Sequence, residues 1–410
     1  LHAQEIQSLG NGLRQLEHGR LTLITDLPID DELKAWPAYL DQALEQWCTV
    51  WNQPLGNDPQ LHVTACLIGD RGLFASAGLL QGVPAFDDGY QLNDTIFVVE
   101  QPSVYYRRHL FLHEATHWIM YRFFGGAGSP WFMEGTADMF GTHAIQEGKL
   151  FLNIIPKRPS EVPKWGRFKR LHEMLDEGSA PSLNEILAYG NERERRNDRY
   201  VWSWAATVFF WNHPEYSKAL ANASRPPLRY GLELSESLEK ELRDQWPSVL
   251  ADWNGFVSDF DFGYEPQRSM TNLADWLRES RDAPARVEVA SDHGWQDTGI
   301  QLRAGESVHL AASGNFTLRK ISGTEPWICG PNGITYQYHQ HLPIGQLIAT
   351  IVPTNGDGTT HRWKILGVGR EQTVTSDGDG RLLLKINEPT GQLKDNEGAL
   401  QVEILKGAKP

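Results

Sequence analysis

The chain has few cysteines, no long apolar run and no excess of positive charge. Its three cysteines, Cys48, Cys66 and Cys329, are too few for a disulfide framework among 410 residues and are not spaced as metal ligands. We expect buried free thiols, with a Cys48–Cys66 bridge as the alternative. No run of about eighteen apolar residues occurs, so no helical membrane span is expected. The net charge of −14 argues against nucleic acid or an anionic membrane as a partner.

Apolar residues are nevertheless plentiful: the chain is 40% hydrophobic, with 16 Phe, 12 Tyr and 15 Trp. This composition is typical of a folded protein, and the length suffices for two domains with separate cores. The first residues, 1–4, resemble the region around a removed signal sequence. On this basis we expect an exported protein, either periplasmic or extracellular.

The sequence His113-Glu114-Ala115-Thr116-His117 lies in an apolar run, 108–124, that contains no Pro or Gly. The run predicts a helix, on which side chains four residues apart share one face. Both imidazoles can then reach one ion at about 2.0–2.1 Å, while Glu114 leans over the open coordination position. The motif predicts a zinc site with a general base beside it.

A second predicted helix follows the glycine-rich turn and carries two carboxylates. Glu134 lies far enough past His117 for the chain to reverse and return a carboxylate to the metal. Asp138, one turn further on the same face, can accept the far N–H of a ligand histidine and so orient its ring. Three ligands, His113, His117 and Glu134, leave a fourth position for water, as in catalytic zinc sites.

His-Glu-x-x-His followed by a helix with Glu-x-x-x-Asp resembles the gluzincin metallopeptidases, the thermolysin-like group. The metzincin pattern differs, because it needs Gly and His where this chain has Met120 and Phe123. The resemblance covers residues 1–262. It implies a zinc peptidase in which Glu114 is the base, Asp138 orients a ligand, and the ligands of Zn²⁺ are His113, His117 and Glu134.

Tyr200 is expected to begin an apolar helix after the charged loop 191–199. In related gluzincins a tyrosine at such a position hydrogen-bonds the oxyanion of the tetrahedral intermediate, so the resemblance implies a catalytic role for Tyr200. The alternative is a tyrosine that caps a core helix. Tyr189 and His213 are weaker candidates for the same task.

Two further histidines are not expected to bind the metal. His109 precedes His113 by one turn, but about 12 Å of helix axis separates it from His117, so both cannot hold one ion. We expect His109 to be structural and His143 to lie at the surface.

The order of the predicted elements indicates an α+β fold. Strands are predicted at 20–27, 61–68 and 94–99, with a helix at 30–47 and mainly helical structure at 165–260. A mixed sheet with helices, followed by a helical lobe, would form the peptidase domain at 1–262. In the resembled family the strand before the motif helix borders the cleft and pairs with the substrate backbone.

The composition changes after Gly263. Residues 263–284 are predicted to link two domains and to include a helix at 272–279. From 285 to 410, short β segments separated by glycine-rich turns predict an all-β sandwich.

This sandwich resembles the calcium-dependent galactose-binding bacterial lectins. In those lectins Ca²⁺ and the sugar share a loop that corresponds to 388–396, so the resemblance implies Ca²⁺ ligands at Glu388, Asp395 and Asn396. The lectins' sugar-contacting His-Pro-x-Gln corresponds to residues 330–333, where this chain has Gly-Pro-Asn-Gly. A sandwich that binds no sugar and packs on the peptidase is therefore an open alternative.

These features predict a zinc-dependent peptidase with an accessory lectin-like sandwich, acting on peptide or protein substrates, glycosylated ones included. One alternative is a glycan-binding or scaffold protein with a vestigial zinc site, which would not need Glu114. Another is a zinc hydrolase that acts on a non-peptide amide or an ester.

Overall fold

The computed structural model describes residues 5–54, 61–190, 196–274, 280–320, 325–354, 356 and 358–406. The chain divides into two compact units. Unit 1 comprises Leu1–Arg167, Tyr189–Thr207 and Ser224–Leu234; unit 2 comprises Phe168–Ala188, Val208–Ala223 and Ser235–Pro410. The helical region is thus shared between the units, and the boundaries expected at 262 and 285 remain predictions. Residues 1–4, on which the expectation of export rests, lie outside the described part.

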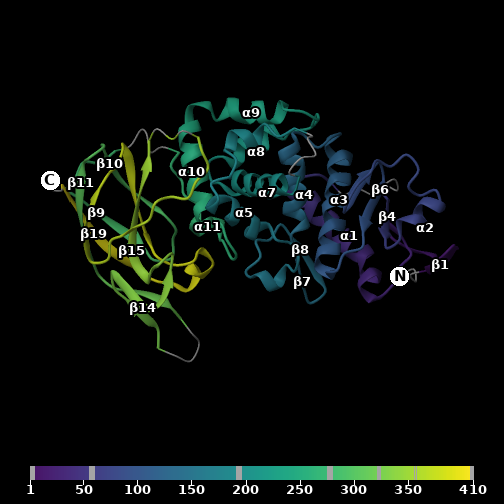
Figure 1. Ribbon diagram of the computed structural model, residues 1–410, viewed down its shortest axis with the longest axis horizontal. Helices are drawn as coiled ribbons and strands as arrows, with labels where there is room; N and C mark the ends of the chain where they lie inside the picture. Colours follow the sequence, from purple (N-terminus) through teal and green to yellow (C-terminus); the bar gives the residue numbers. More distant parts are fainter. Residues whose placement is uncertain are drawn as a thin grey trace. The chain divides into compact units, whose positions relative to one another are not determined.

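A six-stranded mixed sheet forms one layer of unit 1, with the order β1-β2-β3-β4-β6-β5 (Figure 1). The contacts β3/β4 and β4/β6 are parallel, and the others are antiparallel. The strands are β1 Glu5–Gly10, β2 Leu13–His18, β3 Leu21–Thr25, β4 Val63–Ile68, β5 Gly89–Leu92 and β6 Thr95–Val99. The predicted strands β3, β4 and β6 are confirmed. From the resemblance, the strand before the motif helix, β6, was expected to border the cleft as an edge strand. It is not at the edge of the sheet, because β5 pairs with it on that side.

Two long helices of unit 1 bury apolar faces, and specific residues cap their ends. In α1 (Asp31–Val50), Asp30 accepts a hydrogen bond from the Leu33 N–H at 2.9 Å, and the helix buries Trp36 and Trp47. In α3 (Val104–Phe124), Ser103 caps the first turn, and Gly125, with φ 68°, ends the helix in the left-handed conformation. The remaining elements of unit 1 are α2 Arg71–Ser76, α4 Pro130–Gly141, β7 His143–Gln146, β8 Lys149–Leu152, the 3₁₀ turn Pro159–Glu161 and residues 196–207 of α7 (Arg196–Asn212).

Within unit 1, α4 approaches α7 closely at a glycine. A Cβ at Gly135 would lie 2.1 Å from Oγ1 of Thr207 and 2.2 Å from the carbonyl oxygen of Ser203. Only glycine permits this backbone approach. Because Gly135 follows Glu134 directly, the contact fixes the height at which α4 presents the Glu134 carboxylate.

Two antiparallel sheets form the sandwich of unit 2. One has the order β10-β18-β15-β14, with β16 paired to β15, and the other the order β17-β11-β19-β9. Their inner faces share one apolar core, which includes Leu310, Leu382 and Val402. The strands of these two sheets are β9 Ala285–Ala290, β10 Gln296–Leu302, β11 Ser307–Ser313, β14 Asn332–His339, β15 Leu342–Pro353, β16 Leu366–Gly367, β17 Glu371–Thr375, β18 Gly380–Ile386 and β19 Ala399–Lys406. A separate two-stranded sheet is formed by β12 Phe316–Arg319 and β13 Trp327–Cys329. The predicted all-β sandwich is confirmed.

Unit 2 also contains helices. They are α5 Arg167–Asp176, α6 Leu183–Leu187, α8 Ser217–Ala223, α9 Glu233–Glu241, α10 Trp246–Asp259 and α11 Pro266–Ser269, with 3₁₀ turns at Arg243–Gln245 and Thr390–Asp395. The first residue of α5, Arg167, and the first two of α9 belong to unit 1. The linking helix predicted at 272–279 falls mainly on residues 275–279, which lie outside the described part. No helix in the described ranges is long and apolar enough to cross a membrane. All three cysteines are buried free thiols, as expected.

Strand β18 is buried on both faces, which its apolar sequence, Gly-Arg-Leu-Leu-Leu-Lys-Ile, allows. Its outer face contacts α10 and a cluster that includes Trp295 and Trp363. Lys385, on this face, pairs with Asp259 of α10 at 2.5 Å, and the two side chains are 2% and 3% exposed. Water cannot solvate either charge at this depth, so each charge is compensated only by the other.

We therefore expect Lys385→Met to lower the free energy of unfolding by about 3–5 kcal/mol, since Asp259 would remain as an unpaired buried charge. The double variant Lys385→Met with Asp259→Leu should recover most of this loss. Guanidinium denaturation followed by tryptophan fluorescence measures both. Equal destabilisation by the single and the double variant would show that the pair is not coupled.

Candidate metal centre

Helices α3 and α4 bring three donor atoms into one triangle. Nε2 of His113 lies 3.2 Å from Nε2 of His117 and 3.2 Å from Oε2 of Glu134, and the third side of the triangle is 3.4 Å. The histidines meet because they lie one turn apart on α3, and the carboxylate arrives from the neighbouring helix. All three residues were predicted from the sequence, and the structure brings them together.

The triangle has the dimensions of a metal site. Ligand atoms about 2.0–2.1 Å from a zinc ion, at tetrahedral angles, lie about 3.3–3.4 Å from one another. Two imidazoles and a carboxylate are also a donor set that zinc accepts in catalytic sites. The three residues could therefore hold a divalent metal ion and leave one position open.

The electrostatics of the centre favour a cation. Burial lowers the pKa of His113, but the adjacent carboxylates of Asp138 and Glu134 outweigh burial and raise that pKa to about 10. Burial likewise raises the pKa of the Glu134 carboxyl, but His117 and His113 outweigh it and hold the pKa well below its usual range. A pocket that stabilises a protonated imidazole between two carboxylates will also stabilise a bound metal cation.

Asp138 lies beside Nδ1 of His113, the ring nitrogen that does not face Glu134. Its two oxygens accept hydrogen bonds from Arg167 at 2.9 and 3.0 Å, one oxygen also accepts from Nε2 of His109 at 3.1 Å, and the same oxygen lies 3.4 Å from Nδ1 of His113. Nearby positive charge from Arg167 and bonds from the histidines hold the pKa of Asp138 far below its usual value, against the effect of burial. The expected orienting role of Asp138 thus has the geometry it needs.

His109, His113 and Asp138 form a second group that could hold an ion. Arg167 already neutralises the Asp138 carboxylate, which makes this group a poorer cation site than the triangle. We interpret His109 as structural, as its distance along the helix from His117 predicts. Arg167 itself was not predicted as a site residue, because it follows Asp138 by a long stretch of chain and belongs to no motif.

A cavity of about 350 Å³ opens beside the centre. Glu114, next to the ligand His113 in the chain, forms part of its wall, and so does Gly89 at the start of the edge strand β5. A Cβ at Gly89 would lie 2.5 Å from Oε1 of Glu114. The absence of a side chain at residue 89 therefore makes room for the Glu114 carboxylate. The other lining residues are Asp87, Asp88, Tyr106, Leu110, His113, Asp138, Arg167, Asn197, Asp198 and Tyr200.

Tyr200 lies at this cavity, with its ring 5.8 Å from the ring of His113 and 5.6 Å from the Arg167 guanidinium carbon. The expectation that Tyr200 begins its helix is wrong, because α7 already begins at Arg196. Tyr200 therefore does not cap the helix. It lies within the helix, on a side that faces the candidate centre.

The remaining candidates lie elsewhere in the structure. Tyr189 packs against Arg199, whose guanidinium carbon is 5.0 Å from its ring centre. His213 belongs to unit 2, where it is buried, stacks on Tyr216 at 3.8 Å and contacts the Thr271 carbonyl at 3.0 Å. Neither lines the cavity beside the metal triangle.

The surface position expected for His143 is wrong. The ring is only 2% exposed and stacks on Tyr105 of α3 at 4.6 Å, and its Nδ1–H donates to the Gly141 carbonyl at 2.8 Å. Position in the sequence gives no sign of this burial, which results from the packing of β7 against α3.

The loop expected to bind Ca²⁺ is internally bonded. Glu388 is buried, accepts a hydrogen bond from Asn396 at 2.6 Å and lies 3.8 Å from Arg319. Asp395 accepts the Lys320 backbone N–H at 3.0 Å. Burial raises the pKa of Glu388 to about 7. Calcium and sugar binding at this loop remain predictions.

No protein-family model matches the chain, and no curated protein matches its sequence. Among solved structures, the N-terminal domain of EclA, described as a PllA-like lectin, is similar to the C-terminal part; it matches 30% of this chain and 95% of its own, with 21% identity and a TM-score of 0.23. PliG of Aeromonas hydrophila, a periplasmic inhibitor of g-type lysozyme, matches 31% and 91%, with 10% identity and a TM-score of 0.16. At these values neither match indicates what the chain binds or catalyses.

The contact between Gly89 and Glu114 yields a test of the cavity. Gly89→Ala should displace the Glu114 carboxylate, because the new Cβ would lie 2.5 Å from Oε1. We expect any hydrolytic turnover to fall at least about tenfold, since a misplaced proton acceptor loses its reach, with metal content unchanged. Gly378→Ala, whose new Cβ would meet nothing within 4 Å and whose backbone is not left-handed, is the control. Unchanged turnover in Gly89→Ala would mean that Glu114 is free to move.

The buried His143 predicts a specific acid sensitivity. Burial, with nearby Arg108 and His109, lowers its pKa from 6.5 to about 3, so between these values the unfolded chain binds the extra proton and stability falls as the pH falls. We expect this residue to cost about 3 kcal/mol between pH 7 and pH 4. His143→Asn should flatten the pH dependence of the unfolding free energy, and His341→Asn, at an exposed position, should not. Parallel pH profiles for all three proteins would contradict the assignment.

Proposed function

We propose that the chain is a zinc-dependent peptidase whose metal ligands are His113, His117 and Glu134. The observation that carries the proposal is the triangle of donor atoms, 3.2–3.4 Å on each side, next to an open cavity. Zinc held by these residues would supply a Lewis acid for a substrate carbonyl and a lowered pKa for a water molecule. The histidine spacing and the second helix with Glu134 and Asp138 support the same proposal from the sequence.

Glu114 is the proton carrier in this proposal. Its carboxylate takes a proton from the attacking water as the new C–O bond forms at the scissile carbonyl. The same carboxyl then delivers the proton to the leaving nitrogen as the C–N bond breaks. Its side chain is nearly buried and lies at the cavity wall, which is where both transfers require it.

Tyr200 and Arg167 assist in different ways. The Tyr200 hydroxyl would donate a hydrogen bond to the carbonyl oxygen as negative charge develops there, and losing one such donor costs about 10²–10³ in turnover. Arg167 acts through Asp138, whose carboxylate it holds beside His113, so it is a positioning residue. Removing Arg167 would leave the buried Asp138 carboxylate without its arginine counter-charge.

The edge strand favours a peptide as the substrate. Among the described strands, β5 pairs only with β6, and its first residue, Gly89, lines the cavity. An extended peptide can add to such an edge through main-chain hydrogen bonds. Asp87 and Asp88 also line the cavity, so we expect basic side chains near the cleaved bond. The sandwich enters the proposal as an accessory unit, and its binding of glycosylated substrates, like export, remains a prediction.

The decisive experiment combines metal analysis with cleavage of a mixed peptide library. Protein purified without chelator should contain about one zinc per chain, and Glu114→Gln should lose cleavage by at least about 10²-fold while keeping the metal. Glu147→Gln, which removes the same charge from an exposed hairpin of unit 1, should leave cleavage intact. Removing the metal with a chelator should abolish cleavage, and zinc should restore it.

Each way in which this experiment can fail has a distinct meaning. Absence of metal would remove the basis of the proposal. Metal without cleavage of any peptide, ester or non-peptide amide would favour the binding or scaffold protein with a vestigial site. Hydrolysis of esters or non-peptide amides alone would keep Glu114 and the metal centre but replace the peptide as substrate.

A further inference from the structure

A larger cavity, of about 650 Å³, lies at one end of the sandwich in unit 2. The turn 303–305 leads from β10 in one sheet to β11 in the other. Strand register places the neighbouring ends beside it: Leu302 pairs with Gly380, and Val308 with Lys406. The cavity thus lies at the start of β18, whereas the loop with Glu388 follows its end.

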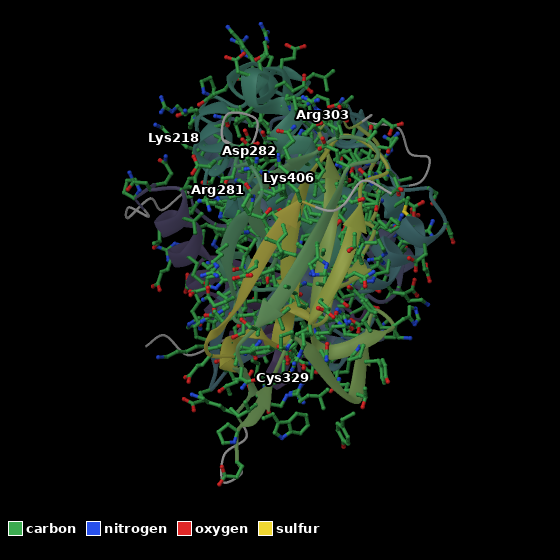
Figure 2. All side chains as sticks on the ribbon, turned by 90° about the vertical axis from the view of Figure 1, so that its left-hand side faces the viewer. Lys218, Arg281, Asp282, Arg303, Cys329 and Lys406 are labelled. Carbon is green, nitrogen blue, oxygen red and sulfur yellow. The ribbon has the colours of Figure 1, made fainter. Side chains whose placement is uncertain are left out.

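Three cations line this cavity: Arg281, Arg303 and Lys406. Figure 2 shows Arg281 and Lys406 close to Asp282, with Arg303 at the same end of the sandwich and Cys329 at the other. In the part of the chain that the structure describes, none of the three side chains forms an ion pair or a hydrogen bond. Their side chains line the cavity, with no ion-pair partner among the described residues.

Two of the cavity's carboxylates are already engaged with the backbone. Glu306 accepts the N–H of Arg303 at 2.9 Å, and Asp379 accepts the N–H of Ala304 at 2.9 Å. These bonds shape the turn between the sheets. Gly299 supports Arg281 in a similar way, because a Cβ there would lie 3.0 Å from the Arg281 side chain. The two carboxylates thus fix the turn, and the close approach of Gly299 leaves room for the Arg281 side chain.

Three cations at one cavity are a local concentration of positive charge in an acidic chain. Acidic residues outnumber basic ones by 52 to 38 in the whole sequence. Elsewhere in the sandwich Arg286 pairs with Glu403, Arg381 with Asp297, and Lys364 with Asp377. At this cavity, by contrast, Arg281, Arg303 and Lys406 converge on one space, an arrangement that suits an anionic ligand.

We propose that this cavity binds a small oxyanion that carries two or more phosphate or carboxylate groups. Guanidinium groups bind such oxygens through paired N–H donors, and an ammonium adds a point charge. The volume lies within the range of small-molecule sites, about 300–1,000 Å³. Asp282, Glu306 and Asp379 surround the cations, and the whole chain is acidic, which disfavours a long polyanion and favours a compact ligand.

Calorimetric titration of the full chain with pyrophosphate, and separately with propane-1,2,3-tricarboxylate, tests the proposal. At low ionic strength we expect a Kd of about 1 mM or tighter for at least one of them. Arg281→Gln and Lys406→Gln should each weaken binding about tenfold. Asp282→Asn should tighten it, because it removes a like charge. Arg370→Gln, at another exposed cation of the sandwich that does not line the cavity, is the matched control.

The variants distinguish a specific site from nonspecific attraction and from binding at another place. Binding of pyrophosphate alone supports the site with phosphate groups as the ligand chemistry, and binding of both anions supports general oxyanion recognition. Equal weakening by Arg281→Gln, Lys406→Gln and Arg370→Gln would overturn the proposal in favour of nonspecific attraction. Binding unaffected by all of these changes would overturn it by placing the anion elsewhere, such as the metal centre. Absence of binding by either anion would also overturn it.

Discussion

The buried carboxylate of Asp138 is the interaction on which the candidate centre depends. It is fully buried, yet four nitrogen atoms from Arg167, His109 and His113 surround its oxygens within 3.4 Å. A lone carboxylate at this depth would be protonated or would draw in water. With Arg167 as its counter-charge it stays ionised, so it can hold the His113 ring with Nε2 directed at the other two donors. The positive charge that balances Asp138 thus comes from Arg167, which lies outside the two helices that carry the metal ligands.

Site residues close together in the sequence could be predicted, whereas contacts between distant segments of the chain could not. His113 and His117 lie within one helix, where spacing alone determines a shared face. Glu134 was predictable because a short turn limits where the next helix can go. Arg167 reaches Asp138 from a distant segment, and no periodicity marks such a contact. His143 was placed wrongly for the same reason, since its burial is produced by a stacking contact with Tyr105.

The fold shows the same division. Strands with apolar alternation or continuous apolar sequence, such as β3, β4 and β6, were predicted. Strands with mostly polar or exposed residues were missed, among them β1, β2 and β5. The missed β5 matters most, because it replaces β6 as the edge strand beside the cavity. Its four residues, Gly-Tyr-Gln-Leu, are held by pairing with β6, which local sequence does not encode.

Gly135 sets how closely α4, the helix that carries Glu134, approaches α7. Because α4 meets α7 backbone to backbone at this residue, the spacing between the helices is set by hard contact and does not depend on the rotamers of core side chains. Changes in the apolar residues between α4 and α7 can then leave the spacing of these two helices unaltered. A side chain at residue 135 would instead push α4 away from α7 and carry Glu134 with it.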